Sequence, residues 1–178
     1  MPNPTAPKRL RHRVVYDGRI FRTEVDTVRL PDGRTVGLEI VRHRGSVVLL
    51  PQPSPEHIVL VRQYRYAIGR WIWELPAGSR EPGERPAVCA RRECEEEIGL
   101  TPHRVQRLMA LYPTPGFCDE LMIFYRCTDL RPPRRRVERD VDEQLEPRTF
   151  AVADARTMVA DGKIIDMKTV VGLRLIGS

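Results

Sequence analysis

Three glutamates spaced for one face of a helix are the residues of this sequence best suited to chemistry. Glu93, Glu96 and Glu97 stand at positions i, i+3 and i+4, so a helix over residues 86–98 would place their carboxylates together on its last two turns. Carboxylates crowded there repel one another and oppose the helix dipole. A divalent cation offsets this cost, because Mg²⁺ prefers carboxylate oxygens together with substrate phosphates. The spacing therefore indicates a magnesium site for phosphate chemistry, whereas a bare run of glutamates would indicate a solvated helix face.

A longer pattern around these glutamates favours the metal site over the solvated face. Residues 78–100 have the form G-x5-E-x7-R-E-U-x-E-E-x-G-U, where U is an apolar residue. The fixed positions are filled by Gly78, Glu84, Arg92, Glu93, Glu96, Glu97 and Gly99, with Cys94 and Leu100 at the apolar positions. This stretch is identified as a Nudix box, in which Cys94 replaces the usual aliphatic residue and packs as a small hydrophobic group.

The resemblance to the Nudix family implies a fold, a reaction and a set of site residues. The fold would be of the α/β class, an α/β/α sandwich around a mixed sheet. The reaction would be attack of water on a phosphoanhydride, with Mg²⁺ or Mn²⁺ as the cofactor. The metal would be held by Glu93, Glu97, Glu96 and the carbonyl of Ala77, with Glu96 also a candidate catalytic residue. The loop and the carboxylates would be braced by Gly78, Glu84 and Arg92.

Sequences on both sides of the box resemble the ADP-ribose pyrophosphatase branch of the family. They are Val61-Arg-Gln-Tyr-Arg65, Glu74-Leu-Pro-Ala-Gly78 and Tyr112-Pro-Thr-Pro-Gly-Phe-Cys-Asp-Glu120. Pro115 lies 15 residues beyond Leu100, as the branch requires, although Thr114 stands where the branch has serine. The resemblance implies hydrolysis of ADP-ribose to AMP and ribose 5-phosphate. The alternatives are another nucleoside diphosphate sugar such as GDP-mannose, a dinucleotide such as NADH or a diadenosine polyphosphate, and a nucleotide-binding sensor without catalysis.

The same branch suggests residues for substrate binding and for activation of water. Substrate would be bound by Arg65, Arg42, Pro115 and Gly116, although either arginine could instead pack its stem along the sheet. Glu143, in the acidic segment 140–146, is the candidate general base, and a mobile loop suits a base that must close over a water. Glu146 and Glu120 are alternative bases, and an acidic solubilising turn is the alternative interpretation of the segment.

Periodicity and turn residues outline the elements that must position these side chains. A β-hairpin is expected from residues 21–30 and 34–41, joined by Pro31-Asp32-Gly33. Further strands are expected over residues 46–50, 57–64, 107–112, 121–127 and 144–151, and helices over 86–98, 153–160 and 166–176. Pro86 suits the first turn of its helix, Gly99 the position after the end, and Asp166 an N-cap. We expect a flexible basic segment over residues 1–13, a β subdomain over 14–45 and a Nudix catalytic domain over 46–178.

Composition limits the partners and the compartment. The 178 residues carry a net charge of +6, and the densest basic run, residues 131–139, contains two prolines and no aromatic residue, which favours a solvated loop over a nucleic-acid surface. No apolar run reaches the ~20 residues that cross a bilayer, and the N-terminus does not resemble a signal peptide. The four cysteines lack disulfide or zinc spacing. We therefore expect a cytoplasmic protein that binds neither nucleic acid nor membrane, and the branch implies a homodimer formed through the N-terminal strands.

Overall fold

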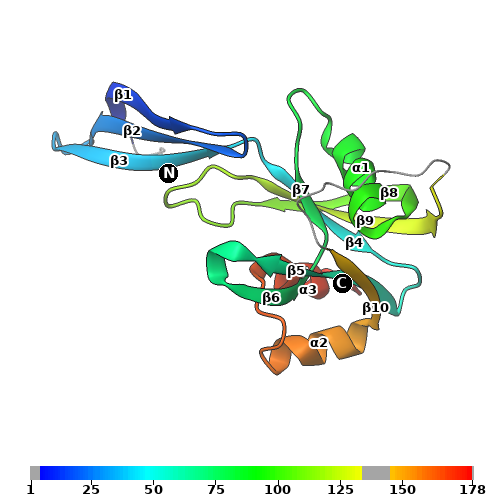
Figure 1. The fold of residues 1–178 in the computed structure, drawn as a ribbon. Coiled ribbons are helices and arrows are strands. Elements are labelled where there is room, and N and C mark those ends of the chain that lie inside the picture. The colour runs from blue at the N-terminus through cyan, green and yellow to red at the C-terminus, as the bar shows by residue number, and fades with distance from the viewer. Residues whose placement is uncertain (1–4, 134–144, 178) are drawn as a thin grey trace. The chain divides into compact units, whose positions relative to one another are not determined.

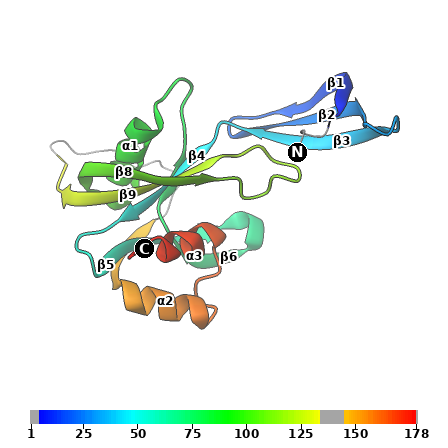
Figure 2. The ribbon, with the colours of Figure 1, turned by 180° about the vertical axis from the view of Figure 1, so that it is seen from behind.

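The computed structural model describes residues 5–133 and 145–177. The chain divides into two compact units, one made of residues 1–45 with 112–121 and the other of residues 46–111 with 122–178. We call them the N-terminal unit and, after the domain expected from the sequence, the catalytic unit, and Figures 1 and 2 show the course of the chain through both.

An antiparallel sheet in the order β1-β2-β3 forms most of the N-terminal unit. Its strands are β1 (Lys8–Asp17), β2 (Phe21–Arg29) and β3 (Thr35–His43). The expected hairpin is confirmed as β2 and β3, with Phe21 opposite His43 and Arg29 opposite Thr35. Its turn is closed by a 2.8 Å hydrogen bond from the Leu30 N–H to the Arg34 carbonyl, and Gly33 takes the positive φ of 89° that the turn requires.

The expectation of a flexible segment over residues 1–13 is wrong from Lys8 onward. Strand β1 begins at Lys8 and pairs with β2 along its whole length. Every residue of β1 is exposed, so its sequence lacks the alternation of apolar and polar residues that marks a half-buried strand. The strand is held by backbone pairing and by ion pairs instead of by apolar burial.

Two sheets, three α-helices and a short 3-10 helix (Tyr66–Ile68) make up the described part of the catalytic unit. One sheet has the order β10-β5-β6, from β5 (His57–Arg65), β6 (Arg70–Glu74) and β10 (Glu146–Ala151). The other has the order β7-β4-β9-β8, from β4 (Ser46–Pro51), β7 (Ala77–Ser79), β8 (Thr101–Leu111) and β9 (Met122–Arg131). It is mixed, because β4 and β9 run parallel and the other pairs are antiparallel. The mixed α/β class is therefore confirmed.

Helices cover both faces of the four-stranded sheet. Helix α1 (Pro86–Ile98) contacts β4, β7 and β8 on one side. On the other side α3 (Met167–Arg174) contacts β4, and α2 (Val152–Ala160) packs on α3 and β10, as Figures 1 and 2 show. The main core lies on that second side and is built from Val48, Leu50, Ile58, Leu60, Leu75, Phe124, Val152, Ala155, Ile164, Leu173 and Ile176.

The helix boundaries follow from local residues. Pro86 occupies the start of α1, and Gly99 ends it in the left-handed conformation with φ 72°. The carboxylate of Asp166 accepts a 3.0 Å hydrogen bond from the Thr169 N–H, which confirms the expected N-cap of α3. The expectations missed strands β6 and β7 and placed the start of β8 six residues too late, because Thr101–Gln106 is mostly polar and carries little apolar alternation.

Within the described residues, no helix is long and apolar enough to cross a membrane. The four cysteines are free; three are buried and Cys118 is half-buried.

Candidate active site

Helix α1 holds two of the three glutamates in the interior. Glu93 and Glu97 are only 8% and 5% exposed to solvent, whereas the side chain of Glu96 is 30% exposed. Glu97 Oε1 accepts a 3.2 Å hydrogen bond from the Ala77 N–H at the start of β7. The helix therefore directs two buried carboxylates toward the strand on which the box begins.

Gly78 lies so close to Glu93 that a side chain at position 78 would displace the Glu93 carboxyl group. A Cβ built at position 78 would stand 1.9 Å from the carboxyl carbon of Glu93 and 2.1 and 2.2 Å from its oxygens. Gly78 itself is held on β7 opposite Val47 of β4. The glycine of the box is thus required for close approach of a carboxylate to the backbone.

Arg92 ties the loop before the helix to the glutamates. Its Nε and Nη2 donate to the two oxygens of Glu84, each at 3.0 Å. Its Nη1 lies 2.8 Å from Glu93 Oε1 and 2.8 Å from Glu96 Oε2. The hydrogen bonds from Arg92 lower the pKa of Glu84 to about 2, and those to Glu84 raise the pKa of Arg92. One guanidinium therefore neutralises part of the negative charge and fixes three carboxylates.

This set of donors fits a hard divalent cation. Carboxylate oxygens, such as those of Glu93, Glu96 and Glu97, and backbone carbonyls, such as that of Ala77, are ligands that Mg²⁺ and Mn²⁺ accept. The Glu93 carboxyl group occupies the space that a Cβ at position 78 would fill. Arg92 links Glu84, Glu93 and Glu96, while β7 brings Gly78 against Glu93 and the Ala77 N–H to Glu97.

Arg65 lies on the same unit, within electrostatic range of the box. Its Nε and Nη2 donate to Glu74 Oε1 and Oε2, both at 2.8 Å. Burial opposes the charged form of Arg65, but the hydrogen bonds to Glu74 and the charges of Glu74, Glu97 and Asp166 leave its pKa raised. The guanidinium is therefore a fixed positive charge near Glu97.

A buried ion network behind Arg65 was not anticipated. Glu74 also accepts a hydrogen bond from Lys168, which in turn bonds Asp166 at 3.1 Å. Thr169 Oγ1 accepts from the Leu75 N–H at 2.7 Å and so ties α3 to the segment leading to the box. Glu74 and Lys168 are 94 residues apart, so no local pattern could pair them.

Arg42, Pro115 and Gly116 all belong to the N-terminal unit. Arg42 Nε donates to Glu24 Oε2 at 2.8 Å, and its Nη1 donates to Asp119 Oδ2 at 3.1 Å. The segment 112–121, which contains Pro115 and Gly116, is bonded to β3 by the Val41 N–H at 2.7 Å from the Phe117 carbonyl. The predicted substrate residues are therefore divided, with Arg65 on the catalytic unit. The proposed base Glu143 lies outside the described residues.

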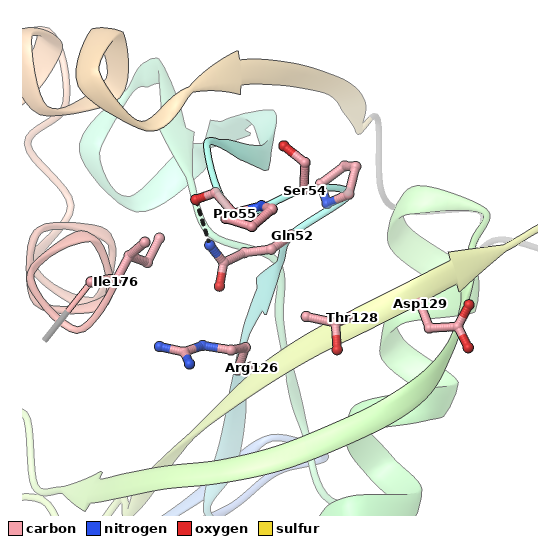
Figure 3. A pocket seen from close by; sticks show the side chains of 9 residues that line it. Gln52, Ser54, Pro55, Arg126, Thr128, Asp129 and Ile176 are labelled. Carbon is pink, nitrogen blue, oxygen red and sulfur yellow. Dashed lines mark hydrogen bonds between the residues drawn. The ribbon is translucent and has the colours of Figure 1, made fainter.

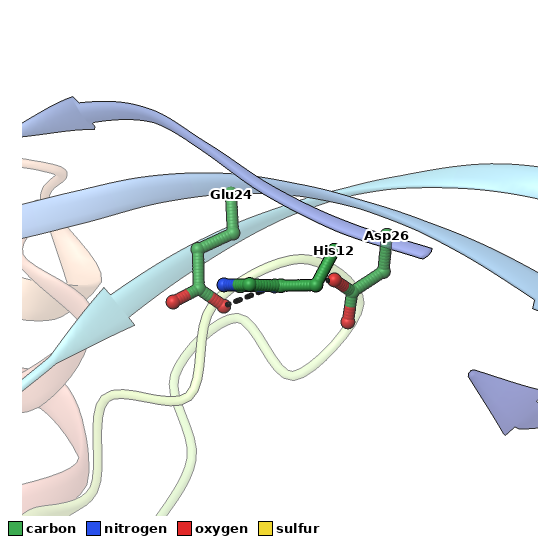
Figure 4. Close-up of side chains that lie close together, drawn as sticks. All are labelled: His12, Glu24 and Asp26. Atoms are coloured by element: carbon green, nitrogen blue, oxygen red, sulfur yellow. Dashed lines mark hydrogen bonds and ion pairs between the residues drawn. The ribbon is translucent and has the colours of Figure 1, made fainter. Parts of the chain in front are cut away.

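A second cluster of ionisable groups lies in the N-terminal unit (Figure 4). His12 Nδ1 is 2.7 Å from Asp26 Oδ1 and 3.9 Å from Glu24 Oε2. The carboxylates also pair with arginines, Glu24 with Arg22 and Arg42, and Asp26 with Arg9. The hydrogen bond from Arg42 lowers the pKa of Glu24, and that from His12 lowers the pKa of Asp26. We interpret this cluster as an ion-pair network that holds β1 on β2.

Comparisons with known families agree with this geometry. A family model described as NUDIX domain matches residues 41–168. A second, described as nucleoside diphosphate sugar hydrolase N-terminal domain, matches residues 8–38. The chain belongs to the Nudix family, and it is a Nudix hydrolase. Such hydrolases generally need a divalent metal.

Individual relatives cover nearly the whole chain. A methanol dehydrogenase activator of Bacillus methanolicus is 34% identical over 95% of this chain and 91% of its own length. An ADP-ribose pyrophosphatase of Bacillus subtilis is 33% identical over 91% of this chain and 88% of its own. A crystal structure of an ADP compounds hydrolase has the same fold, with a TM-score of 0.85 at 23% identity, covering 99% of this chain and 95% of that one.

Proposed function

We propose that this protein hydrolyses the pyrophosphate bond of ADP-ribose and releases AMP and ribose 5-phosphate. The observation that carries the reaction type is the pair of buried carboxylates, Glu93 and Glu97, directed at Gly78 and Ala77. Support for the substrate comes from the flanking sequences around Arg65 and Pro115 and from the relative in Bacillus subtilis that is an ADP-ribose pyrophosphatase.

We assign the metal to Glu93, Glu97, Glu96 and the Ala77 carbonyl, with Mg²⁺ or Mn²⁺ as the ion. When bound, the metal neutralises charge on the pyrophosphate and lowers the pKa of water. Arg92 and Glu84 hold the carboxylates in place before metal and substrate arrive, through the bonds that join them to Glu93 and Glu96. Gly78 keeps the backbone clear of Glu93.

The remaining assignments concern substrate and water. Arg65, whose charge is fixed by Glu74, supplies a guanidinium for phosphate oxygens, a geometry that arginine matches well. Arg42, Pro115 and Gly116 form the second group of substrate residues. Glu143 removes the proton from the attacking water, and the alternatives within the described residues are Glu96, Glu120 and Glu146.

We also propose that the protein is a cytoplasmic homodimer that binds neither nucleic acid nor membrane. Support for the dimer comes from the N-terminal sheet, where Val14, Val15 and Tyr16 of β1 are 44%, 54% and 55% exposed. Exposed apolar side chains that gather on one strand are typical of an interface.

The test is turnover of ADP-ribose, followed as phosphate released after phosphatase coupling, in Glu97→Gln and in Glu95→Gln. Glu95 is on the same helix but accepts a 2.6 Å hydrogen bond from Thr101, which glutamine preserves. We expect Glu97→Gln to reduce Mg²⁺-dependent turnover by roughly 10²-fold or more, and Glu95→Gln to leave it nearly unchanged. Unchanged turnover in a folded Glu97→Gln protein would contradict the metal assignment.

The substrate is tested by ranking kcat/KM for ADP-ribose, GDP-mannose, NADH and diadenosine polyphosphates. We expect ADP-ribose to be first. GDP-mannose turned over equally well or better would replace ADP-ribose while leaving the reaction type intact. Nucleotide binding with no turnover of any of these compounds would favour a sensor over an enzyme.

A further inference from the structure

A cavity of about 500 Å³ lies in the catalytic unit away from the box (Figure 3). It begins where β4 ends, at Gln52, whereas the box glycine pairs with Val47 near the start of β4. Five residues of extended strand span roughly 16 Å. The volume of the cavity is in the range of small-molecule pockets. The cavity is therefore separate from the Glu93–Glu97 site.

An arginine interrupts the core-facing row of β9 at this cavity. Alternate residues of a strand share a face, and Met122 and Phe124 both pack into the main core. Arg126 follows in the same row, directly opposite the core residue Leu50 of β4, and Thr128 comes next. The sequence thus places a charge where the preceding pattern places apolar side chains.

The charge of Arg126 has no counter-ion within residues 5–133 and 145–177. Its Nη2 donates to the Leu175 carbonyl at 3.3 Å, and its buried Nε has no hydrogen-bond partner there. The end of α3 is held independently by Arg156, which donates to the carbonyls of Leu173 at 3.2 Å and Ile176 at 2.6 Å. Capping of α3 therefore does not account for the charge of Arg126.

Two other arginines of this unit show which groups the Nε and Nη2 donors of a guanidinium bind. In Arg65 and in Arg92, Nε and Nη2 together bind both oxygens of one carboxylate, at 2.8 Å and 3.0 Å respectively. In Arg126 the corresponding donors find no carboxylate, because Nη2 bonds a backbone carbonyl and the buried Nε has no partner in the described residues. A guanidinium charge that no carboxylate balances is costly in a partly buried place unless an anion reaches its remaining donors.

The other walls of the cavity offer hydrogen-bonding groups beside apolar ones. Gln52 is 6% exposed and donates through Nε2 to the Pro55 carbonyl at 3.4 Å, which leaves its Oε1 as an acceptor (Figure 3). Thr128 contributes a hydroxyl, and the carboxylate of Asp129 is already bonded by Arg131 at 3.0 and 3.2 Å. Pro53 and Ile176 add apolar surface. Among the described lining residues, Arg126 is therefore the charged group without an ion-pair partner.

We propose that this cavity binds a small anionic compound that carries hydroxyl groups, such as a sugar phosphate or a sugar acid. Its phosphate or carboxylate pairs with Arg126, and its hydroxyl groups bond Gln52 Oε1 and Thr128 Oγ1. The site is independent of the reaction at Glu93 and Glu97.

The test is titration of the full chain, followed by backbone amide NMR shifts, with ribose 5-phosphate, gluconate, inorganic phosphate and uncharged ribose. We expect the anionic sugars to bind with Kd of about 1 mM or tighter and to shift the amides of Gln52, Thr128 and Gly177. Preference between ribose 5-phosphate and gluconate identifies phosphate or carboxylate as the anion. Ribose should leave these amides in place.

Variants separate this site from binding elsewhere. Arg126→Gln should weaken binding about 10-fold or more, because a charge-assisted bond is lost, whereas Arg148→Gln, an exposed arginine on β10, should not. Thr128→Val keeps the charge of Arg126 and should weaken binding of the anionic sugars several-fold without weakening binding of inorganic phosphate. This variant tests the proposal even where Arg126→Gln fails to fold. The proposal is overturned if the cavity amides do not move with either anionic sugar, if the shifts gather only at Gly78 and Glu93, or if a folded Arg126→Gln binds as wild type does.

Discussion

Gly78 and Glu93 show how a single atom at one residue controls a carboxylate on another element. A methyl group at position 78 would occupy the place of the Glu93 carboxyl group. Because the neighbours are backbone of a sheet on one side and a buried helix on the other, the carboxylate would have to move. Metal binding should therefore be more sensitive to this glycine than stability is.

Gly78→Ala should reduce Mg²⁺-dependent turnover about 10- to 100-fold, the range found when a group supporting a metal ligand is lost. Gly37→Ala is the matched control, because a Cβ there meets nothing within 4 Å. The measurements are kcat against Mg²⁺ concentration and the thermal unfolding midpoint. Equal turnover in the two variants would show that Glu93 is not a ligand.

Glu84 gives a prediction for acid stability in the metal-free protein. Its pKa in the folded state is about 2, below the ordinary 4.5, because Arg92 bonds the ionised form. A depressed pKa contributes stability that is complete above pH 4.5 and is lost as the pH falls toward 2.

Glu84→Gln should lower the free energy of unfolding by about 1–2 kcal/mol at pH 7 and flatten its decline between pH 4.5 and pH 2. Urea unfolding at several pH values measures both effects. Glu81→Gln, at an exposed neighbour, serves as the control and should leave the pH profile as it is. A Glu84→Gln profile that declines as steeply as wild type would place the acid sensitivity elsewhere.

At the level of single residues, the sequence was most informative where spacing alone determines proximity. The faces of a helix follow from its period, so Glu93 and Glu97 could be paired in advance, and both are buried against β7, Glu93 beside Gly78 and Glu97 at the Ala77 N–H. Contacts across long stretches of chain have no such periodic signal. The bonds from Arg42 to Asp119, 77 residues away, and from Lys168 to Glu74 required the fold.

Helix α3 positions the start of the box as well as closing the core. Thr169 is fully buried, and its hydroxyl accepts the N–H of Leu75, two residues before Ala77. The same hydroxyl donates to Asp166 Oδ2 at 2.5 Å. Without it, a backbone donor would be buried with no partner.

Thr169→Val should therefore destabilise the protein by about 1–3 kcal/mol, the cost of a buried donor left unpaired. Thr157→Val on α2, where the hydroxyl bonds the Ala153 carbonyl at an exposed position, should cost less than about 0.5 kcal/mol. Chemical denaturation with both variants provides the comparison. Equal losses would mean that the Leu75 N–H finds another partner.

Helices and hairpins could be predicted from the sequence where particular residues mark their ends. Pro86 and Gly99 bound α1, and Asp32 and Gly33 make the turn of the β2–β3 hairpin. Strand β1 has neither apolar alternation nor burial, so only its pairing with β2 defines it. Short strands such as β7 likewise exist because β4 lies beside them.

The proposed dimer is a property of the whole molecule. We expect sedimentation or light scattering at micromolar concentration to give the mass of two chains. Val15→Asp on β1 should shift the mass toward one chain, because a charge would replace an apolar side chain that is 54% exposed. Ile165→Asp, at a comparably exposed apolar residue of the catalytic unit, should not change the mass. A wild-type monomer would refute the dimer.

The chain enters the catalytic unit after Gly45, leaves it after Leu111 and returns at Met122. The N-terminal unit is therefore encoded by two separate stretches, because the segment 112–121 is bonded to β3 through Val41, Arg42 and His43. Recombination that exchanges only residues 1–45 would combine a foreign sheet with the native segment 112–121 and break the Arg42–Asp119 pair. A chimera that exchanges this unit as a working whole must carry both stretches. Domain shuffling at this junction therefore requires that two distant parts of the gene be replaced together.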